Sequence, residues 1–466
     1  MVNYSTDFQI FIISKIKNIT FFTLTSIFLS ASSCAKEEQT TIPKETIEEP
    51  IIELPSLPSV SQPIYEGPTG NVWVYKNNKI DNGYVLVNDA SDNRVYLMTK
   101  EAKVVYEWNL PAGIGNDAEL MDDGRLLVSL NAENVFYDIG GYAGRIQLIN
   151  PDRSVAWDYL YSSQESISHH DVEMLPDGNI LFLAWQKKTK QEALLAGYDG
   201  SPDNEILLPE SIIEINPETD QIEWEWHAWD HLIQDIDSTK SNYGSISDNP
   251  QKIDINYYDD ERGDLMHANG LDYDPNRDLI FLSVNFYSEV WVLDHSTTKT
   301  EAALETGGNY NKGGSLIYRF GNPTAYKNNK GNRLFFNNHF PNILKNNEIG
   351  AGNILIYMNG NDGSEQSRIY ELDMPDEFTL KPDTNNEPSI LWEFTDSELY
   401  SPLVSGAVRL PNGNTLITEG RYGYWEVTNE GEVVWKFEGN KLFWRGYTYP
   451  IDHPGVKLLN LINLSD

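Results

Sequence analysis

One local pattern recurs along most of the chain: a short polar turn containing Gly, Asn or Asp, followed directly by a strongly apolar run of strand length. Such turn residues between runs rich in β-branched and aromatic residues are typical of antiparallel strands joined by tight turns. The pattern occurs six times, in DNGYVLV (81–87), MDDGRLLVSL (121–130), LPDGNILFLAW (175–185), YDPNRDLIFLSV (273–284), GAGNILIYM (350–358) and LPNGNTLITEG (410–420). The chain is therefore predicted to be an all-β protein built from six similar units.

Each unit continues with two further strands, and the last strand ends in an aromatic residue. Six antiparallel units of this kind predict a six-bladed β-propeller around a central channel. The segment NVWVY (71–75) is expected to pair with the last blade and close the ring. The units are longer than ordinary blades, so loop or helical insertions are expected, the largest at 186–210, 228–264 and 296–314. A β-sandwich with a second domain is the alternative, and the regular repeat argues against it.

The N-terminal segment has the pattern of an export signal rather than of folded structure. Lys15 and Lys17 precede a short apolar run at 19–29, which ends at the small residues Ala-Ser-Ser before Cys34. This order predicts a lipoprotein signal peptide (1–33), cleaved before a lipidated Cys34, with an ordinary signal peptide as the alternative. The apolar run is too short for a permanent transmembrane helix. The protein is therefore expected in a bacterial cell envelope, anchored by lipid to the outer membrane and facing the periplasm or the surface.

Residues 34–62 are rich in Glu, Pro, Ser and Thr and lack hydrophobic periodicity, which predicts a flexible acidic tether. The propeller is then expected to occupy residues 63–466. The Lys36-Glu37-Glu38 cluster resembles a short charged signal for export to the outer surface. Cys34 is the single cysteine of the chain, so an intrachain disulfide is excluded.

Composition and charge narrow the range of partners. With 40% hydrophobic and 12% aromatic residues, the chain is not of the disordered class. The formal net charge of −36 disfavours nucleic acid and anionic lipid headgroups as partners, which leaves the N-terminal lipid as the membrane contact. If the substrate is an anion, the site must supply its own local positive charge.

Polar residues occupy equivalent places in the repeat. Counting back eight residues from the turn glycine gives His170 in the third unit, Ser405 in the last and Asn116 in the second. His267 and His339 precede the innermost strand of their units at about the same place. The chain starts the innermost strand of each blade here, at one mouth of the channel, so these side chains are expected to converge. Converging imidazoles either bind a metal or act as nucleophile, acid and base on an anionic substrate.

The other histidines are given structural roles. His169 is expected to point away from its neighbour, because alternate side chains of an extended strand face opposite sides. His227 and His231 are expected to pack near the start of an insertion, His295 lies in a turn, and His453 belongs to the tail.

Several long segments carry a family resemblance: HHDVEMLPDGNILFLAW, WEWHAWDHLIQD, HANGLDYDPNRDLIFLSVNFYSEVWVLDHSTT, YRFGNP, LFFNNH and SGAVRLPNGNTLITEG. They span roughly 165–440, and with them the chain resembles the bacterial arylsulfotransferase family. The resemblance implies a six-bladed propeller that needs neither a nucleotide donor nor a cofactor. It implies transfer of a sulfuryl group from a phenolic sulfate to a phenol, with His339 as the nucleophile that becomes sulfated. His170 and His267 would act in acid/base chemistry and sulfate binding.

The chain departs from this family at one position. Asn285 stands where the catalytic relatives carry an arginine that would hold the sulfate oxygens. Arg421 is the expected substitute because it ends the second strand of the last blade, in the slot equivalent to Asn285. Arg319 is a weaker candidate on an outer strand. Because arginine is missing at position 285, a second hypothesis is a non-catalytic lipoprotein that binds glycan or protein at this mouth of the channel. A third hypothesis is a metal-dependent hydrolase or lyase that uses the three histidines.

Overall fold

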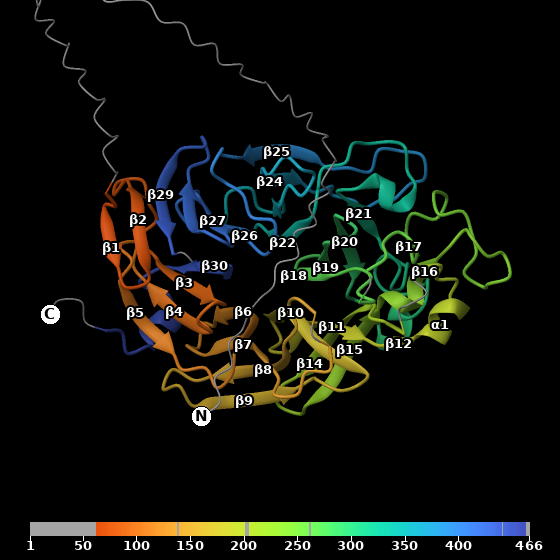
Figure 1. Ribbon diagram of the computed structural model, residues 1–466, viewed down its shortest axis with the longest axis horizontal. Helices are drawn as coiled ribbons and strands as arrows, with labels where there is room; N and C mark the ends of the chain where they lie inside the picture. The colour runs from red at the N-terminus through yellow and green to blue at the C-terminus, as the bar shows by residue number, and fades with distance from the viewer. Residues whose placement is uncertain (1–61, 138, 201–204, 261, 440, 463–466) are drawn as a thin grey trace, which may run out of the picture. The chain divides into compact units, whose positions relative to one another are not determined.

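The computed structural model describes residues 62–462 except 138, 201–204, 261 and 440. The expected signal peptide, nearly all of the expected tether and Cys34 lie outside the described residues. Within the described part, six antiparallel sheets of four or more strands surround a central channel, as the ring of strands in Figure 1 shows, and two further sheets have two strands each. The prediction of an all-β, six-bladed propeller is confirmed.

Four blades are built from strands that follow one another along the chain, from the channel outward. Blade 2 contains β6 (Ile114–Leu120), β7 (Leu126–Asn131), β8 (Gly144–Ile149) and β9 (Val155–Leu160). Blade 3 contains β10 (Ser166–Met174), β11 (Ile180–Gln186), β14 (Glu210–Asn216) and β15 (Gln221–His227). Blade 4 contains β18 (Ala268–Asp274), β19 (Leu279–Val284), β20 (Glu289–Asp294) and β21 (Tyr318–Phe320). Blade 5 contains β22 (Asn338–Ile343), β23 (Ile354–Met358), β24 (Arg368–Asp373) and β25 (Ser389–Phe394).

The two remaining blades combine strands from both ends of the described chain. Blade 6 contains β26 (Gly406–Arg409), β27 (Thr415–Glu419), β28 (Gly423–Val427) and β29 (Val433–Glu438), with β2 (Gly70–Tyr75) and β1 (Tyr65–Gly67) added at its outer edge. Blade 1 contains β30 (Phe443–Tyr449), β3 (Tyr84–Asp89), β4 (Arg94–Met98) and β5 (Val104–Trp108). The pairing of 71–75 with the last blade is confirmed, because Val72 of β2 pairs with Phe437 of β29. The second closure, in which β30 becomes the innermost strand of blade 1, was not predicted.

The core lies between the blades. The second strands β11, β19 and β23 are buried along nearly their whole length, because a neighbouring blade packs on each side. Burial on both faces explains why these strands appear as unbroken apolar runs in the sequence. One cluster between blades 4 and 5 joins Phe281 and Val292 to Ile356 and Leu372, all fully buried. Each such side chain stabilises the fold by roughly 1.5–3 kcal/mol relative to an exposed one.

The long insertions fall at the expected places and contain short elements. They hold β12 (Lys188–Thr189), α1 (Lys190–Leu195), β13 (Ile206–Leu207), η1 (Ala228–His231), β16 (Leu232–Ile233), β17 (Ile253–Asp254) and α2 (Lys299–Ala302). Two further short helices are η2 (Pro323–Tyr326) and α3 (Pro454–Lys457). Both α1 and α2 begin with a capping box, Thr189 with Glu192 and Thr298 with Glu301. In the part of the chain that the structure describes, no helix is long and apolar enough to cross a membrane.

Candidate active site

The three aligned histidines lie at one mouth of the channel, on three successive blades. His170 belongs to β10, His267 directly precedes β18, and His339 belongs to β22. The rings of His170 and His267 meet edge to face, with centroids 4.7 Å apart. Burial is the largest cause of the lowered pKa values of His170 and His339, and the proximity of His267 lowers both further. The structure therefore brings all three imidazoles into one electrostatically coupled group.

His339 is held in a single tautomer by Asn359, which follows β23 directly. The Asn359 amide Nδ2 donates to the carbonyls of Ser401 (2.8 Å) and Val404 (3.2 Å), so its Oδ1 faces His339 as an acceptor. Nδ1 of His339 lies 2.7 Å from this oxygen and must carry the proton. Burial lowers the pKa of His339 to about 3, so the ring is neutral at pH 7. Its Nε2 therefore keeps a free lone pair.

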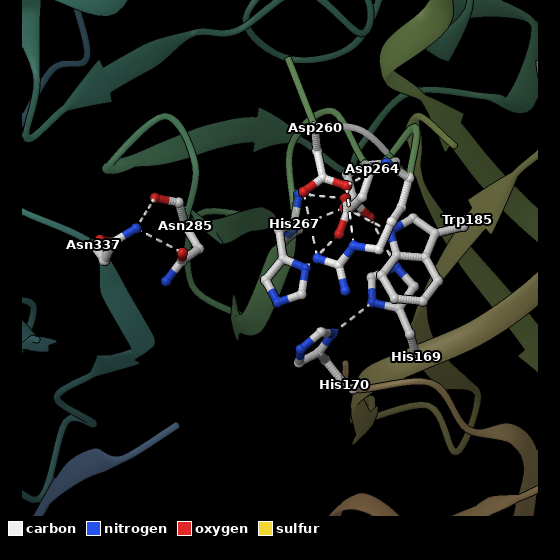
Figure 2. Close-up of polar contacts among 12 residues, drawn as sticks. His169, His170, Trp185, Asp260, Asp264, His267, Asn285 and Asn337 are labelled. Atoms are coloured by element: carbon white, nitrogen blue, oxygen red, sulfur yellow. Dashed lines mark hydrogen bonds and ion pairs between the residues drawn. The ribbon is translucent and has the colours of Figure 1, made fainter. Parts of the chain in front are cut away.

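His267 has the opposite electrostatics. Nδ1 of His267 lies 2.5 Å from Oδ2 of Asp264, and Oδ1 of Asp264 accepts from the backbone N–H of His267 at 3.1 Å. Burial alone would lower the pKa of His267, but the charge and hydrogen bond of Asp264, with a further contribution from Glu210, raise it above the usual value. Figure 2 shows His267 with its ring facing His170. One of the three imidazoles is thus stabilised in its protonated form.

His170 is neutral and is contacted by its chain neighbour. Nδ1 of His169 lies 2.9 Å from Nδ1 of His170, the contact drawn in Figure 2. The His169 ring stacks on Trp185 (centroids 3.9 Å apart, 14° between planes), and its Nε2 lies 2.8 Å from Oε2 of Glu210, at an angle outside hydrogen-bond geometry. Burial and the charges of the neighbouring histidines hold the pKa of His170 well below its usual value.

The expectation that His169 points away from His170 is wrong. His170 adopts a left-handed backbone conformation, with φ of 51°, and the pairing of β10 with β11 shifts register between His169 and Val172. Such a bulge breaks the alternation of an extended strand, so consecutive side chains can share one face. His227 and His231 do pack as expected, for example with the His231 ring stacked on Trp226.

Asn116 and Ser405 brace the loops of the site and make no direct contact with a histidine among the described hydrogen bonds. Nδ2 of Asn116 donates to the carbonyl of Gly141 at 2.6 Å, and the N–H of His170 donates to the same carbonyl at 2.9 Å. A Cβ built on Gly141 would stand 2.0 Å from the His170 ring, so this glycine backs the imidazole directly. Ser405 is fully buried and accepts from the N–H of Gly420 at 3.0 Å.

Asn285 lies between blades 4 and 5, on the same mouth as the histidines. Its N–H donates to the carbonyl of His267 (3.2 Å) and its Nδ2 to the carbonyl of Asn338 (3.1 Å). Nδ2 of Asn337 donates back to the carbonyl and to Oδ1 of Asn285, at 3.1 and 2.8 Å, as Figure 2 shows. The position at which the family resemblance implies an arginine is therefore filled by an amide pair.

The two arginines named from the sequence lie elsewhere. Arg421 is exposed on the turn between β27 and β28, and the described residues offer it neither a hydrogen bond nor an ion pair. Arg319 is fully buried and bonded to Glu289 and to the carbonyls of Pro250 and Lys252, so its guanidinium is occupied by the fold.

An aromatic cavity of about 560 Å³ lies at this mouth, separated from His267 by Phe286, and none of the three histidines is among its lining residues. Phe286 stacks on the His267 ring with centroids 4.8 Å apart, and Tyr258 stacks on Phe286 at 4.3 Å. The remaining wall is polar. The cavity is lined by Tyr257, Tyr258, Asn285, Phe286, Ser288, Arg333, Asn337, Asn361 and Pro402. Aromatic side chains with a few polar groups usually line small-molecule sites, and the volume of this cavity is in the usual range for such sites.

Phe340 and Arg445 fill the channel near the histidines. The guanidinium of Arg445 lies 4.1 Å from the centre of the Phe340 ring and donates to Asp171 at 2.7 Å. The neighbouring inner strands carry glycine where Phe340 packs, because a Cβ on Gly406 would come within 2.7 Å of its ring and one on Gly270 within 3.1 Å of its Cα. Arg445 belongs to β30, the strand that the sequence did not reveal, although the alternating aromatics of FWRGYTY were a usable signal.

A larger cavity of about 690 Å³ lies at the opposite end of the inner strands, beside the polar turns. Glu119, Glu173 and Asp272 line it together with Lys345. Burial, followed by the charges of neighbouring carboxylates, raises the pKa of Glu173, and a balance of burial against Lys345 leaves the pKa of Asp272 at about 7. Seven acidic side chains and four of Lys or Arg line this cavity, which gives it an acidic balance, and the three aligned histidines lie at the other mouth. The histidine mouth is therefore the candidate active site, although its cavity is the smaller one.

Converging histidines can also bind a metal. Within the described ranges, no group of three or more His, Cys, Asp or Glu side chains has an arrangement that could hold a metal ion.

The fold and the site define a class of protein: a six-bladed propeller that gathers three imidazoles of different protonation at one mouth, beside an aromatic cavity. Sequence comparison names the family. The profile described as Arylsulfotransferase (ASST) matches residues 75–441, and the chain belongs to the arylsulfotransferase family. Membership supports aryl sulfotransferase activity in general, with an aryl sulfate as donor and a phenol as acceptor.

Other comparisons add little. No curated protein matches the chain. Among solved structures, the β-propeller domain of Cps50 (Swd1) from Myceliophteria thermophila is 8% identical, with 82% of this chain and 89% of that one covered and a TM-score of 0.36. A Bacteroides fragilis protein provisionally assigned as a 6-phosphogluconolactonase is 11% identical, with coverages of 78% and 83% and a TM-score of 0.37. Similarities at this level carry no argument about function.

Proposed function

We propose that this protein moves a sulfuryl group from a phenolic sulfate ester to a phenol, without a nucleotide donor, through a covalent sulfohistidine at His339. The observation that carries the proposal is the difference in protonation among three adjacent imidazoles. His339 and His170 are neutral because they are buried, whereas Asp264 favours the charged form of His267. Neighbouring groups whose pKa values are driven apart in this way supply a nucleophile and an acid in one site.

In the first half-reaction, the lone pair on Nε2 of His339 attacks the sulfur of the donor. An N–S bond forms while the S–O bond to the aryl group breaks, and the electron pair leaves with the phenolate oxygen. His267 gives its proton to that oxygen. The sulfated imidazole carries positive charge, which the hydrogen bond from Nδ1 to Asn359 spreads. A positioned acid of this kind contributes about 10²–10⁴-fold to the rate when the leaving phenol is weakly acidic.

In the second half-reaction, the acceptor phenol takes the place of the first. His267, now neutral and paired with Asp264, removes the proton of the phenol as its oxygen attacks sulfur. The S–N bond breaks and its electrons return to Nε2 of His339, which restores the starting site. His170 is proposed to hold a sulfate oxygen or the phenol oxygen. This role follows if His169 carries its proton on Nδ1 and donates it to Nδ1 of His170, because His170 then carries its own proton on Nε2 and can donate it to that oxygen.

The stacked pair of Phe286 and Tyr258 gives the aryl ring of the substrate its place. The rings of His267 and Tyr258 cover the two faces of Phe286, so the aryl ring would contact the edges of this stack, and edge-to-face aromatic contacts contribute roughly 0.5–1.5 kcal/mol beyond burial.

The proposal is tested by measuring sulfuryl transfer to a phenol and by trapping the sulfated protein. Purified protein incubated with 4-nitrophenyl sulfate and a phenol, with neither nucleotide nor metal added, should release nitrophenol and form the new aryl sulfate. Omitting the phenol should leave protein heavier by the mass of one sulfuryl group. His339→Ala should abolish both signals, whereas His453→Ala, in the tail, should keep them. Transfer that survives in His339→Ala excludes the covalent mechanism.

A second candidate function is a non-catalytic propeller lipoprotein that binds glycan or protein at this mouth. Asn285 favours it, because an amide replaces the guanidinium expected of a catalytic relative. Introducing Asn285→Arg separates the two candidates. Activity in the wild type, or activity gained by the variant, supports the enzyme, and inactivity of both supports the binding protein.

A further inference from the structure

We infer that Arg333 is the cation that binds the sulfate group of the donor, in place of the arginine missing at position 285. The inference rests on the proposed function for the identity of the ligand. Arg333 was not among the residues selected from the sequence, because it lies in the loop before β22 and occupies no repeat position.

Arg333 lines the same cavity as Asn285, Phe286 and Asn337. Two hydrogen bonds fix its guanidinium, from Nε to the carbonyl of Phe335 (2.7 Å) and from Nη2 to Oγ of Ser288 (3.0 Å). The ring of Phe336 lies 4.5 Å below the guanidinium. The side chain is therefore held in place at the cavity although it is exposed.

Ser288 links this guanidinium to the amide pair. Its Oγ accepts from the backbone N–H of Asn337 at 3.0 Å and donates to the carbonyl of Asn285 at 3.4 Å. Arg333 is thus one hydrogen-bonded residue away from the position where the arginine of the catalytic relatives begins. A guanidinium that reaches the site from the next blade can serve the same anion.

The charge of Arg333 is free to act on a ligand. Both of its acceptors, a carbonyl and a hydroxyl, are neutral, and no ion pair to it occurs in the described part of the chain. The other arginines near this mouth are neutralised, Arg262 by Asp260 and Arg445 by Asp171. In a protein of net charge −36, an uncompensated guanidinium at the cavity is what an anionic donor requires. Its planar fork also matches two oxygens of a sulfate group.

The experiment measures binding without turnover. In the His339→Ala background, calorimetric titration with 4-nitrophenyl sulfate should give an affinity at least 10-fold weaker when Arg333→Ala is added. Arg368→Ala, at the start of β24 and away from the cavity, should leave the affinity unchanged. Arg421→Ala tests the competing assignment, in which Arg421 binds the sulfate group. If affinity falls with Arg421→Ala and not with Arg333→Ala, the inference is overturned.

Two further measurements distinguish sulfate binding from a structural role. In the otherwise native protein, Arg333→Ala should raise KM for the anionic donor and leave KM for an uncharged phenol unchanged. Adding Asn285→Arg to Arg333→Ala should restore most of the donor affinity, because the two positions serve the same oxygens. A folded double variant that regains no affinity contradicts this shared role. Protein that binds the donor through Arg333 but transfers nothing supports the inference and removes the proposed function.

Discussion

Nδ1 of His339 lies 2.7 Å from Oδ1 of Asn359, and this contact decides which nitrogen of the imidazole is available for chemistry. Because the Asn359 amide nitrogen is engaged with two carbonyls, its oxygen cannot exchange places with it. The proton therefore stays on Nδ1, and Nε2 remains the nucleophile.

Replacement of Asn359 should test that relationship. Asn359→Ala removes the acceptor, so the ring can rotate and change tautomer, and kcat for the release of nitrophenol should fall by about 10–10³-fold with little change in KM. Asn359→Asp places a carboxylate opposite Nδ1, raises the pKa of His339 and should retain more activity than the alanine variant at neutral pH. Burst kinetics measure both. Equal and unaltered bursts in the two variants would show that Asn359 does not orient the nucleophile.

The protonation of His267 predicts an alkaline limit to the first half-reaction. The raised pKa means that His267 keeps its proton up to a pH above the usual histidine value and loses it as the pH rises further. Release of a weakly acidic phenol from phenyl sulfate should fall over that range, while 4-nitrophenyl sulfate, whose leaving group needs little protonation, should be much less affected.

Asp264→Asn should move the same alkaline limb to lower pH, because it removes the charge that stabilises the imidazolium. The measurement is the pH profile of the single-turnover rate with phenyl sulfate. His339 adds no limb near neutrality, since its pKa of about 3 leaves it unprotonated throughout. A limb that stays at the same pH in Asp264→Asn would assign the titration to another group.

A glycine pair separates the packing of His170 from backbone strain. Gly141 has φ of 87°, and a Cβ added there would lie 2.0 Å from the His170 ring, whereas Gly178 has φ of 91° and a Cβ added there would meet nothing within 4 Å. Alanine at either position should cost roughly 1–2 kcal/mol of unfolding free energy for the left-handed backbone. Gly141→Ala should in addition displace the imidazole and lower kcat at least 10-fold, and Gly178→Ala should not. Chemical denaturation and steady-state kinetics on both variants provide the comparison.

The lipid anchor remains a prediction from the sequence. Replacing Cys34 with Ala should block signal cleavage or release the protein from the membrane fraction, because the acylated thiol is the proposed attachment. Membrane fractionation and the intact mass of the mature N-terminus measure this. A variant that fractionates and is processed like the wild type would rule out lipidation at this residue.

The repeat in the sequence was sufficient to predict the propeller and to align His170, His267 and His339, because each blade begins its inner strand at the same place relative to the turn. It could not predict the partners of these histidines. Asp264 comes from an insertion and Asn359 from the end of β23, and neither has a counterpart that a repeat would mark.

Two other features depended on local geometry. A β-bulge places the side chains of His169 and His170 next to each other, although alternation along a regular strand would separate them. The alternation of polar and apolar residues does not show where a bulge occurs. Arg421 occupied the correct slot by position in the repeat, yet it is exposed on its turn, while Arg333 reaches the cavity from a loop. The position of a residue in the repeat therefore predicts at which mouth of the channel it lies. It does not predict where a long side chain such as that of arginine points or how far it extends.

The innermost strand of blade 1 is β30, and its partner β3 is made more than 350 residues earlier. A chain that is synthesised or exported from its N-terminus therefore presents β3 with an unpaired edge until residues 443–449 have emerged. Unpaired edges of apolar strands invite wrong pairing and aggregation. Arg445 belongs to β30, so the side chain that fills the channel near the three histidines is also put in place last. A chain that lacks β30 would have five complete blades, but blade 1 would lack its inner strand and the channel would not be closed. Assembly of the active site at the channel therefore depends on pairing between the two ends of the described chain.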